Sequence, residues 1–417
     1  MTPRTPRIAI IGAGPGGLTC ARVLQRNGVP VTVFDHDASA DARPQGGTLG
    51  LPVTIAQEAL RAAGLYEEFA ALACPEGQEV RLLDHTATVL FHHVPAPAPG
   101  ETGRPETGRP ETGRPETGRP EADRSATDRS ATDRSEIDRA ALRRLLLDSL
   151  APDTVRWRSY LRTLHPLGDG RHQAEFDDGH TEAFDLVIGA DGTWSRVRPM
   201  LSDAAPHYTG VTFVESGFED ADTRHPEVAR LVGGGSMRAE SAAQGLLARR
   251  DGRGRIRLYA AFRGSQDWAL DAGVRKEDTE AVRAVLLDRF ADWDERLLTL
   301  LRDNDGGFVN RPLFALPVPH LWTHTPGLTL LGDAAHLMSP FTGRGADLAM
   351  LDGAELGGAL TGHGDPDEAV RAYETAMLPR AAEAAEADAR ALADALAPDA
   401  PRGSLRHLRA AFGDPRP

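Results

Sequence analysis

The hydrophobic positions near the start of the chain predict a strand, a helix and a second strand. A β-rich run that begins at Arg7 leads into GAGPGG at residues 12–17, and apolar residues then recur at helical spacing from Leu18 to Asn27. Gly28 closes that segment, and the apolar run from Val31 to Phe34 follows. Short continuous apolar runs are typical of buried parallel strands, so the region predicts a β-α-β unit.

The glycines of this unit stand where a nucleotide would bind. Gly12, Gly14 and Gly17 form a GxGxxG pattern between the strand and the helix, and Asp35 ends the second strand 18 residues after Gly17. Such a turn brings pyrophosphate close to the backbone and to a helix amino end, while the acid accepts from a ribose hydroxyl. The pattern predicts a dinucleotide site, and the acid favours FAD or NAD over NADP there.

A late stretch, Thr329 to Asp352, predicts the second half of a ligand site. An apolar strand from Leu328 to Leu331 breaks at Gly332 and delivers Asp333 at its carboxyl end, where open α/β sheets bind ligands. The loop SPFTGRG follows, and from Ala346 apolar residues at helical spacing begin a helix. An ordinary strand, loop and helix with a structural aspartate is the alternative.

Four other polar residues are candidates either for contacts with a ligand or for structural roles. Asp191 follows a buried-type strand in GADGTWSRVR, again at the ligand-binding edge. Arg139 opens a helix expected from Ile137 to Leu150, where a cation opposes the helix dipole. This placement indicates either a nearby ligand anion or carbonyl, or only the last arginine of the five-residue repeat. Arg43 contacts either a phosphate or water, and His336, which has no evident partner in the sequence, is expected to be structural rather than a base.

A repeat and a change of pattern divide the chain. Four copies of ETGRP and their continuation fill residues 101–135 without a large apolar residue, which predicts disorder. From His207 to Leu316 β-rich segments dominate, interrupted by a helix from Lys276 to Phe290, and a long helix runs from Pro366 to about Leu396, with a possible break at Pro379.

These patterns predict an α/β (mixed α+β) protein, in which a Rossmann-like FAD/NAD(P)-binding domain carries an inserted antiparallel β-sheet substrate domain and a long C-terminal helix. We expect residues 1–100, 136–206 and 318–361 to form the FAD-binding domain, 101–135 the disordered repeat, 207–317 the substrate-binding domain and 362–417 the helical tail.

Composition narrows the function classes. The chain is 41% hydrophobic and 26% charged, with no apolar run near the roughly 18 residues that span a bilayer. Its net charge of -14 argues against a nucleic-acid partner. Cys20 and Cys74 lack metal-ligand spacing. We expect a cytoplasmic monomer with no membrane partner and no metal.

Three motifs in order, GAGPGG, GADGTWSRVR and GDAAHLMSPFTGRGADLAMLD, resemble those of FAD-dependent aromatic hydroxylases of the para-hydroxybenzoate hydroxylase fold. Through GGTLGLPVTIAQEALRAAGL, EIDRAALRRLLLDSLAPDTVRW and FADWDERLLTLL the chain is most similar to the Tet(X)-type tetracycline-inactivating monooxygenases. The resemblance implies an NADPH contact at Arg43 and FAD contacts at Gly12, Gly14, Gly17, Asp35, Arg139, Asp191, Asp333, Pro340, Gly343, Gly345 and Ala346.

The implied chemistry belongs to the cofactor. NADPH would reduce FAD, O2 would form the flavin C4a-hydroperoxide, and a hydroxyl group would pass to a tetracycline-like or other polycyclic aromatic substrate. No catalytic protein residue is required. The helix amino end after Gly345 would supply positive potential to reduced flavin.

Several residues depart from the tetracycline-inactivating pattern. Gly50 stands where those enzymes carry an acid, Asp347 replaces an asparagine in the flavin loop, and Glu215 and Arg257 stand near the positions of their substrate-contacting residues. The departures leave FAD binding intact and tetracycline itself open as the substrate.

Two alternatives remain: a flavoprotein oxidoreductase that inserts no oxygen, and a non-catalytic flavin-bearing protein that binds a drug. A flavin halogenase is disfavoured because its WxWxIP segment has no counterpart here.

Overall fold

A computed structural model describes residues 6–42, 47–73, 79–94, 134–251 and 254–413. Three features lie outside these ranges: the predicted contact at Arg43, the thiol of Cys74, and all but the end of the predicted repeat.

A five-stranded parallel sheet forms the centre of the nucleotide-binding part, in the order β17-β11-β1-β2-β7. Its strands are β1 (Ile8–Ile11), β2 (Val31–Phe34), β7 (Val155–Arg156), β11 (Leu186–Gly189) and β17 (Leu328–Leu330). Every residue of β1, β11 and β17 is buried, which accounts for their uninterrupted apolar runs. The predicted β-α-β unit is therefore confirmed.

Two smaller sheets accompany it. One is antiparallel, with β8 (Leu161–Pro166), β9 (His172–Phe176) and β10 (Thr181–Phe184); the other pairs β3 (Thr48–Pro52) with β6 (Arg134–Asp138). The expected helix from Ile137 begins two residues later, because Ile137 and Asp138 belong to β6 and Asp138 caps helix α5 (Arg139–Asp148) by accepting from the Ala141 amide at 3.0 Å.

Helices α1 (Pro15–Arg26) and α12 (Gly345–Gly362) cross in close contact. A Cβ added to Gly353 would lie 2.2 Å from the carbonyl oxygen of Gly16, and one added to Gly16 would lie 2.5 Å from that of Ala349. Glycine at these positions lets the two backbones touch. As a result, two helices that begin more than three hundred residues apart in the chain are packed together.

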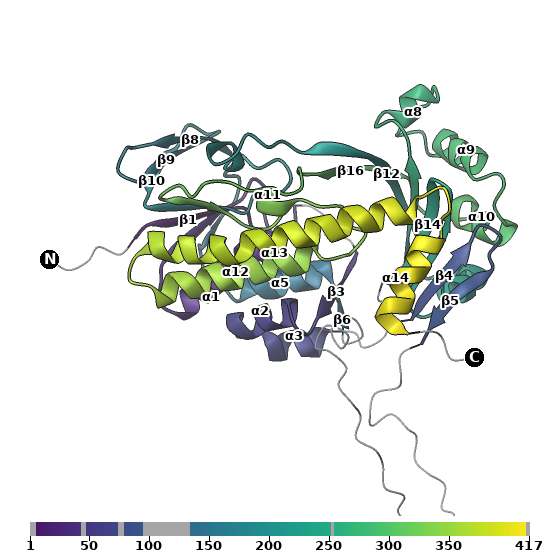
Figure 1. Cartoon of the computed structure of the whole chain (residues 1–417), viewed down its shortest axis with the longest axis horizontal. Coiled ribbons are helices and arrows are strands. Elements are labelled where there is room, and N and C mark those ends of the chain that lie inside the picture. Colours follow the sequence, from purple (N-terminus) through teal and green to yellow (C-terminus); the bar gives the residue numbers. More distant parts are fainter. Residues whose placement is uncertain (1–5, 43–46, 74–78, 95–133, 252–253, 414–417) are drawn as a thin grey trace, which may run out of the picture.

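The remaining helices of this part cover the parallel sheet and its edges. They are α2 (Ala56–Ala63), α3 (Tyr66–Leu72), η1 (Arg198–Met200), α11 (Asp333–His336) and α13 (Pro366–Ala395). The last helix, α14 (Arg402–Phe412), follows α13 and packs against strand β5 (Val89–His93) through Phe412. Helix α13 runs beside α12 and is continuous, so the break considered at Pro379 does not occur (Figure 1).

A seven-stranded sheet forms the second part, in the order β16-β12-β15-β14-β13-β4-β5. Its strands are β12 (His207–Phe218), β13 (Ser236–Ser241), β14 (Gln244–Asp251), β15 (Arg255–Arg263), β16 (Val309–Ala315), β4 (Val80–Asp84) and β5 (Val89–His93). Residues 1–100 were expected to belong wholly to the FAD-binding domain, but β4 pairs in parallel with β13. That expectation is wrong for β4 and β5, since sequence distance does not limit strand pairing.

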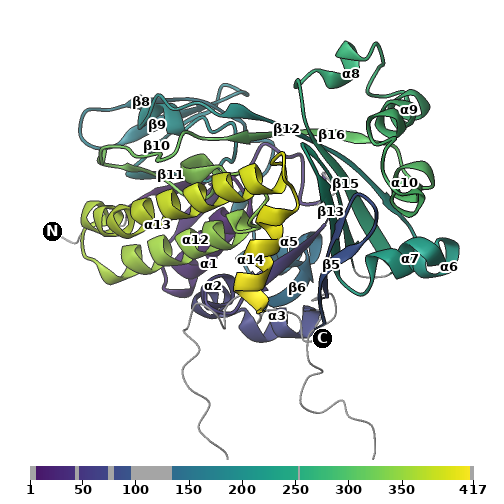
Figure 2. The same cartoon turned by 45° about the vertical axis from the view of Figure 1, so that its right-hand side comes forward.

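One face of this sheet packs against a helical layer made of α6 (Ala221–Arg224), α7 (Pro226–Val232), α8 (Trp268–Asp271), α9 (Thr279–Arg289) and α10 (Glu295–Arg302). Figure 2 shows these helices on the side of the sheet away from α12 and α13. The other face carries Phe213, which packs against Phe341 and the end of α13. We call this second face, with Phe213, Glu215, Arg257 and Tyr259, the substrate face.

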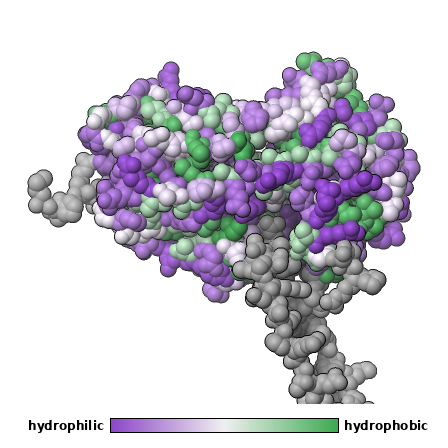
Figure 3. Space-filling model, in the orientation of Figure 1, coloured by the Kyte–Doolittle hydropathy of each residue, from purple (hydrophilic) through white to green (hydrophobic). Residues whose placement is uncertain are grey.

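Among the residues that the structure describes, no helix combines the length and the apolar character needed to cross a bilayer. Hydrophilic and hydrophobic residues are interspersed on the face shown in Figure 3.

Candidate flavin site and substrate face

The first glycine turn has the geometry of an anion-binding loop. Gly12 has a φ of +112°, and an added Cβ would lie 2.2 Å from the Ala190 carbonyl oxygen, so this glycine permits contact between strand ends. Gly14 is different: its added Cβ would meet nothing within 4 Å. Helix α1 begins there without a side-chain cap and without an acid in its first turn, which leaves its amide groups available to a phosphate.

Asp35 lies at the end of β2, where the sequence predicts it. Its carboxylate accepts from the Ala13 amide at 2.7 Å and from the Asp37 amide at 2.8 Å, and the residue is 6% exposed. Each carboxylate oxygen retains a second lone pair, so a ribose hydroxyl can still donate to it. Asp35 therefore fixes the glycine turn in addition to its predicted role.

Arg143 is a buried residue of this region that the sequence reasoning missed. Its guanidinium donates to the carbonyls of Ala40 at 2.5 Å and Ala13 at 3.4 Å, pairs with Asp37 at 3.4 Å, and lies 5.4 Å from the centre of the Trp157 ring. Through these contacts Arg143 connects the glycine turn to the segment that follows β2. Its only sequence signal is an arginine on the apolar side of an amphipathic helix.

Asp191 follows β11 as predicted, and most of its observed contacts are structural. One carboxylate oxygen accepts from the Arg196 amide at 2.6 Å, whereas the other is buried without a hydrogen-bond partner among the described residues. Burial raises the pKa of Asp191. Arg198, also missed in the sequence, donates to the carbonyl oxygens of Thr193 at 2.7 Å and Ala334 at 3.1 Å and so ties this turn to α11.

Asp333 begins α11 directly after β17, beside the start of α12. A Cβ added to Gly345 would lie 3.9 Å from an Asp333 carboxylate oxygen. Burial raises the pKa of Asp333, while the positive charges of His336, Arg139 and Arg198 act in the opposite direction. The structure thus brings Asp333, Arg139 and the amino end of α12 into one region.

Arg139 itself is exposed at the first position of α5, and its amide donates to the Gly47 carbonyl at 2.9 Å. Its partner Gly47 lies next to the substrate face, since a Cβ added to Gly47 would lie 3.9 Å from the Nε of Arg257. Asp347, in the first turn of α12, is only 1% exposed. Its carboxylate is therefore part of the protein interior.

The loop SPFTGRG at residues 339–345, which we call the flavin loop, is bonded to helix α13. The carboxylate of Asp388 accepts from the Ser339 hydroxyl, and also from the Thr342 amide and hydroxyl, both at 2.9 Å. Pro340 lies exposed between these anchors, and Gly343 adopts a φ of +67° in open space. Asp388 is a further residue that the sequence did not mark, since nothing in a helical repeat of alanine and acids indicates a partner.

His336 has a partner that was not evident in the sequence. Its Nε2 lies 2.6 Å from the carboxylate of Asp352, which is fully buried and also binds Arg380 at 3.1 Å and the Gly332 amide at 3.1 Å. The imidazole is thus held inside the protein, in agreement with the structural role we expected.

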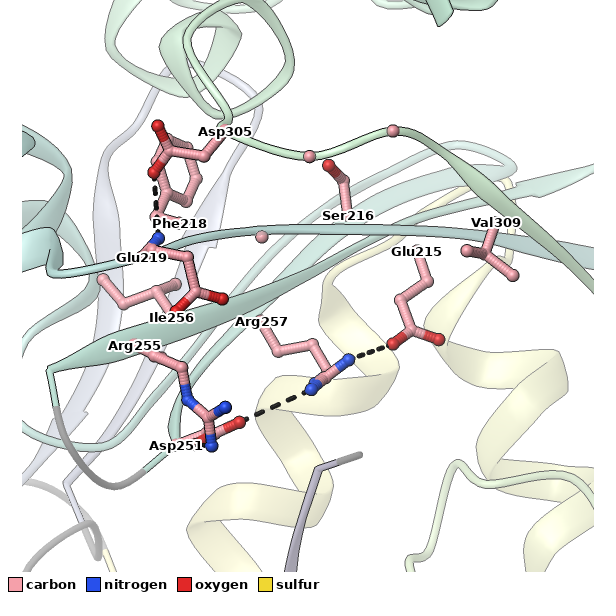
Figure 4. A pocket seen from close by; sticks show the side chains of 13 residues that line it. Glu215, Ser216, Phe218, Glu219, Asp251, Arg255, Ile256, Arg257, Asp305 and Val309 are labelled. Carbon is pink, nitrogen blue, oxygen red and sulfur yellow. Dashed lines mark hydrogen bonds and ion pairs between the residues drawn. The ribbon is translucent and has the colours of Figure 1, made fainter. Parts of the chain in front are cut away.

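The substrate face carries a network of charged side chains. The carboxylate of Glu215 accepts from both Arg257 and Arg311, and Arg257 also pairs with Asp251 at 3.5 Å. Burial lowers the pKa of Arg257, but the bond to Glu215 outweighs this effect and the pKa is raised. Figure 4 shows Glu215, Arg257 and Asp251 along a hollow of about 340 Å³ between β12, β15 and the loop 305–307.

The chain resembles known proteins over nearly its whole length. The family model described as an FAD binding domain matches residues 5–255 and 323–388. Monooxygenase penA of Penicillium thymicola is 30% identical over 91% of this chain and 92% of its own. HpxO of Klebsiella pneumoniae, solved with FAD and uric acid, is 19% identical and superposes with a TM-score of 0.74, covering 96% of this chain and 91% of that one.

The similar proteins are varied, and they do not place the chain specifically with the tetracycline-inactivating enzymes. The tetracycline destructase Tet(55) is 21% identical with a TM-score of 0.68, and the alignment covers 100% of both chains, so it shares the fold with this chain, as HpxO does. The family match and the similarity to penA establish the family of the chain in addition to its fold. The chain belongs to the FAD binding domain family and is an FAD-dependent monooxygenase of the aromatic-hydroxylase type.

Proposed function

We propose that this enzyme uses NADPH and O2 to hydroxylate a tetracycline-like or other polycyclic aromatic molecule bound between the flavin loop and the substrate face. The single observation that carries the proposal is the contact between the loop 339–345 and the substrate face, where the ring centroids of Phe341 and Phe213 lie 5.6 Å apart. A cofactor held by this loop and by Asp333 would lie against a substrate held by the substrate face.

The residues fit FAD from two sides. The uncapped start of α1 beside Gly14 suits the pyrophosphate, and Asp35 suits the adenosine ribose. The amino end of α12, with Gly343, Gly345 and Ala346, suits the flavin ring, and Asp333 and Arg139 suit polar groups between ring and phosphate. The remaining assigned contacts are Gly12, Gly17, Asp191 and Pro340.

Bound FAD supplies the redox and oxygen chemistry, and this chain's residues supply position and potential. The aligned amides at the start of α12 favour negative charge on a flavin ring. Asp388 holds the loop that would contact the ring, because it fixes Ser339 and Thr342 on either side of Pro340. The rings of Phe213, Tyr259 and Phe341 form an apolar wall that would exclude water.

The size and lining of the site support a small molecule with several rings. The hollow of about 340 Å³ lies in the range of small-molecule pockets, and Arg255 and Arg257 line it. On the same face of the sheet, the rings of Phe213 and Tyr259 would suit a flat apolar molecule with oxygen substituents. Among the similar proteins, penA is named a monooxygenase, HpxO is solved with uric acid, and Tet(55) is named a tetracycline destructase.

The test is a turnover assay with the purified FAD-loaded protein. NADPH or NADH is supplied under air with tetracycline, other polycyclic phenols and single-ring phenols, and products are analysed by mass spectrometry. We expect NADPH consumption that the substrate stimulates and a product heavier by one oxygen atom, with the oxygen derived from O2. Stimulated NADPH oxidation without oxygenated product across the panel would indicate an oxidoreductase instead. Flavin binding without any stimulation would indicate a binding protein.

A further inference from the structure

We propose that Glu215 neutralises the substrate face, so that the enzyme selects neutral, oxygen-substituted aromatic molecules over aromatic carboxylates. This inference rests on the proposed function, because it assumes that the substrate binds at this face. It makes Glu215 a specificity-determining residue.

The substrate face carries several arginines, and their number alone would suggest that it binds an anion. Among the described residues around Glu215, however, four of them have acidic partners: Arg249 pairs with Glu136, Arg255 with Asp251 at 2.9 Å and Asp138 at 3.8 Å, and Arg257 and Arg311 with Glu215. Four guanidinium groups thus face four carboxylates. This part of the wall is therefore highly polar and balanced in charge.

Glu215 has the central place in this balance. It is 7% exposed, it lies between Arg257 and Arg311, and it faces the hollow drawn in Figure 4. A substrate carboxylate would need either to displace Glu215 from both arginines or to lie beside it as a second anion. Both alternatives are unfavourable at a partly buried site, where like charges repel strongly and a displaced carboxylate loses its partners.

A neutral oxygen substituent on a substrate is not repelled by Glu215 in this way. A guanidinium has five N–H donors, and the bonds to Glu215 use only some of those of Arg257 and Arg311, whose side chains are 24% and 56% exposed. The remaining N–H groups can donate to a carbonyl or hydroxyl oxygen while the bonds to Glu215 are kept. The aromatic rings of Phe213 and Tyr259, 5.5 Å apart, lie on the same face and would contact the substrate's ring system.

The approach of β3 also restricts the space available for an extra charge. A Cβ added to Gly50 would lie 2.7 Å from Glu136 and 3.4 Å from Arg249, and one added to Gly47 would lie 3.9 Å from Arg257. The charged network is therefore covered by backbone on the side of β3. A ligand anion there would be shielded from solvent, which strengthens its repulsion from Glu215 and Asp251.

The experiment measures binding to the FAD-loaded protein through the change in flavin absorbance, without turnover. The probes are matched acids and amides: salicylate with salicylamide, and 3-hydroxy-2-naphthoate with its amide. We expect the wild type to bind each amide more tightly than its acid. In Glu215→Gln the acid should gain about tenfold relative to the amide, because two arginines lose their shared counter-charge. Arg311→Gln should shift the ratio in the opposite direction.

Glu182→Gln is the matched control. Glu182 also bridges two arginines, Arg7 and Arg156, but it lies on β10, in a different sheet from the substrate face. Its substitution removes the same charge and should leave the acid-to-amide ratio unchanged. The proposal is overturned if the wild type prefers the acids, if no amide binds, or if Glu215→Gln and Glu182→Gln give the same ratio. Amides that bind as expected but are never hydroxylated, with no turnover elsewhere in the substrate panel, would count against the proposed function alone.

Discussion

The imidazole Nε2 of His336 lies 2.6 Å from the carboxylate of Asp352, and His336 belongs to the same short helix, α11, as the candidate flavin ligand Asp333. The same carboxylate accepts from the amide of Gly332, the residue immediately before Asp333. This pair therefore links the position of a predicted cofactor ligand to a buried ion pair with Arg380 behind it.

Replacing His336 with glutamine should lower the free energy of unfolding by roughly 2–4 kcal/mol, since it removes one partner of a buried pair. Burial lowers the pKa of His336, but Asp352 raises it above its ordinary value of 6.5. The stabilisation is complete below the unfolded pKa and is lost as pH rises through the higher folded pKa.

Thermal unfolding of the apoprotein from pH 6 to pH 9 tests whether the stabilisation by His336 decreases as the pH rises. The wild type should lose its advantage over His336→Gln as the pH rises. Other charged groups near the imidazole, namely Asp333, Arg380 and His320, are present in both proteins and cancel in the comparison. A constant difference at every pH would show that the imidazole stays neutral.

Asp333→Asn should leave the protein folded and weaken FAD binding by about ten- to hundredfold, because a charge-assisted hydrogen bond contributes about 1.5–3 kcal/mol. Flavin content after gel filtration and FAD titration of the apoprotein provide the measurement. Asp169→Asn, in an exposed turn paired with Arg171, is the control and should retain wild-type flavin content. Undiminished flavin in Asp333→Asn would mean that the site is misassigned.

Arg139→Ala should weaken FAD binding less than Asp333→Asn, by about three- to tenfold, because an exposed cation interacts through solvent. Arg144→Ala lies on the same helix, where its side chain pairs with Asp148 at 3.0 Å in solvent. Titration of both apoproteins at low and high salt should show a salt-dependent loss for Arg139→Ala only. Equal affinities of the two variants would remove Arg139 from the proposed site.

Gly353→Ala should destabilise the protein by about 1–3 kcal/mol, because the new methyl group would lie 2.2 Å from the Gly16 carbonyl oxygen and would push α12 away from α1. Gly358→Ala, on the exposed side of the same helix with nothing within 4 Å, should instead stabilise by about 0.5–1 kcal/mol. Chemical denaturation measures both effects. FAD affinity should fall in the first variant only, since the two helix starts would separate.

The sequence by itself determined the parts of this protein that local spacing encodes. The first β-α-β unit, the strand before Asp333 and the helix after Gly345 follow from apolar periodicity and glycine placement, because burial of a strand or of one helix face requires those patterns. The family resemblance added FAD and monooxygenase chemistry, which the family match confirms.

The tertiary structure decided which distant residues meet. Arg143, Arg198 and Asp388 hold the site through partners more than forty residues away, and no periodic pattern records such contacts. The structure also moved β4 into the second sheet and placed Glu215 between two arginines from different strands. Pairing of strands and of charges depends on positions in space, and folding fixes these only when the whole chain has packed.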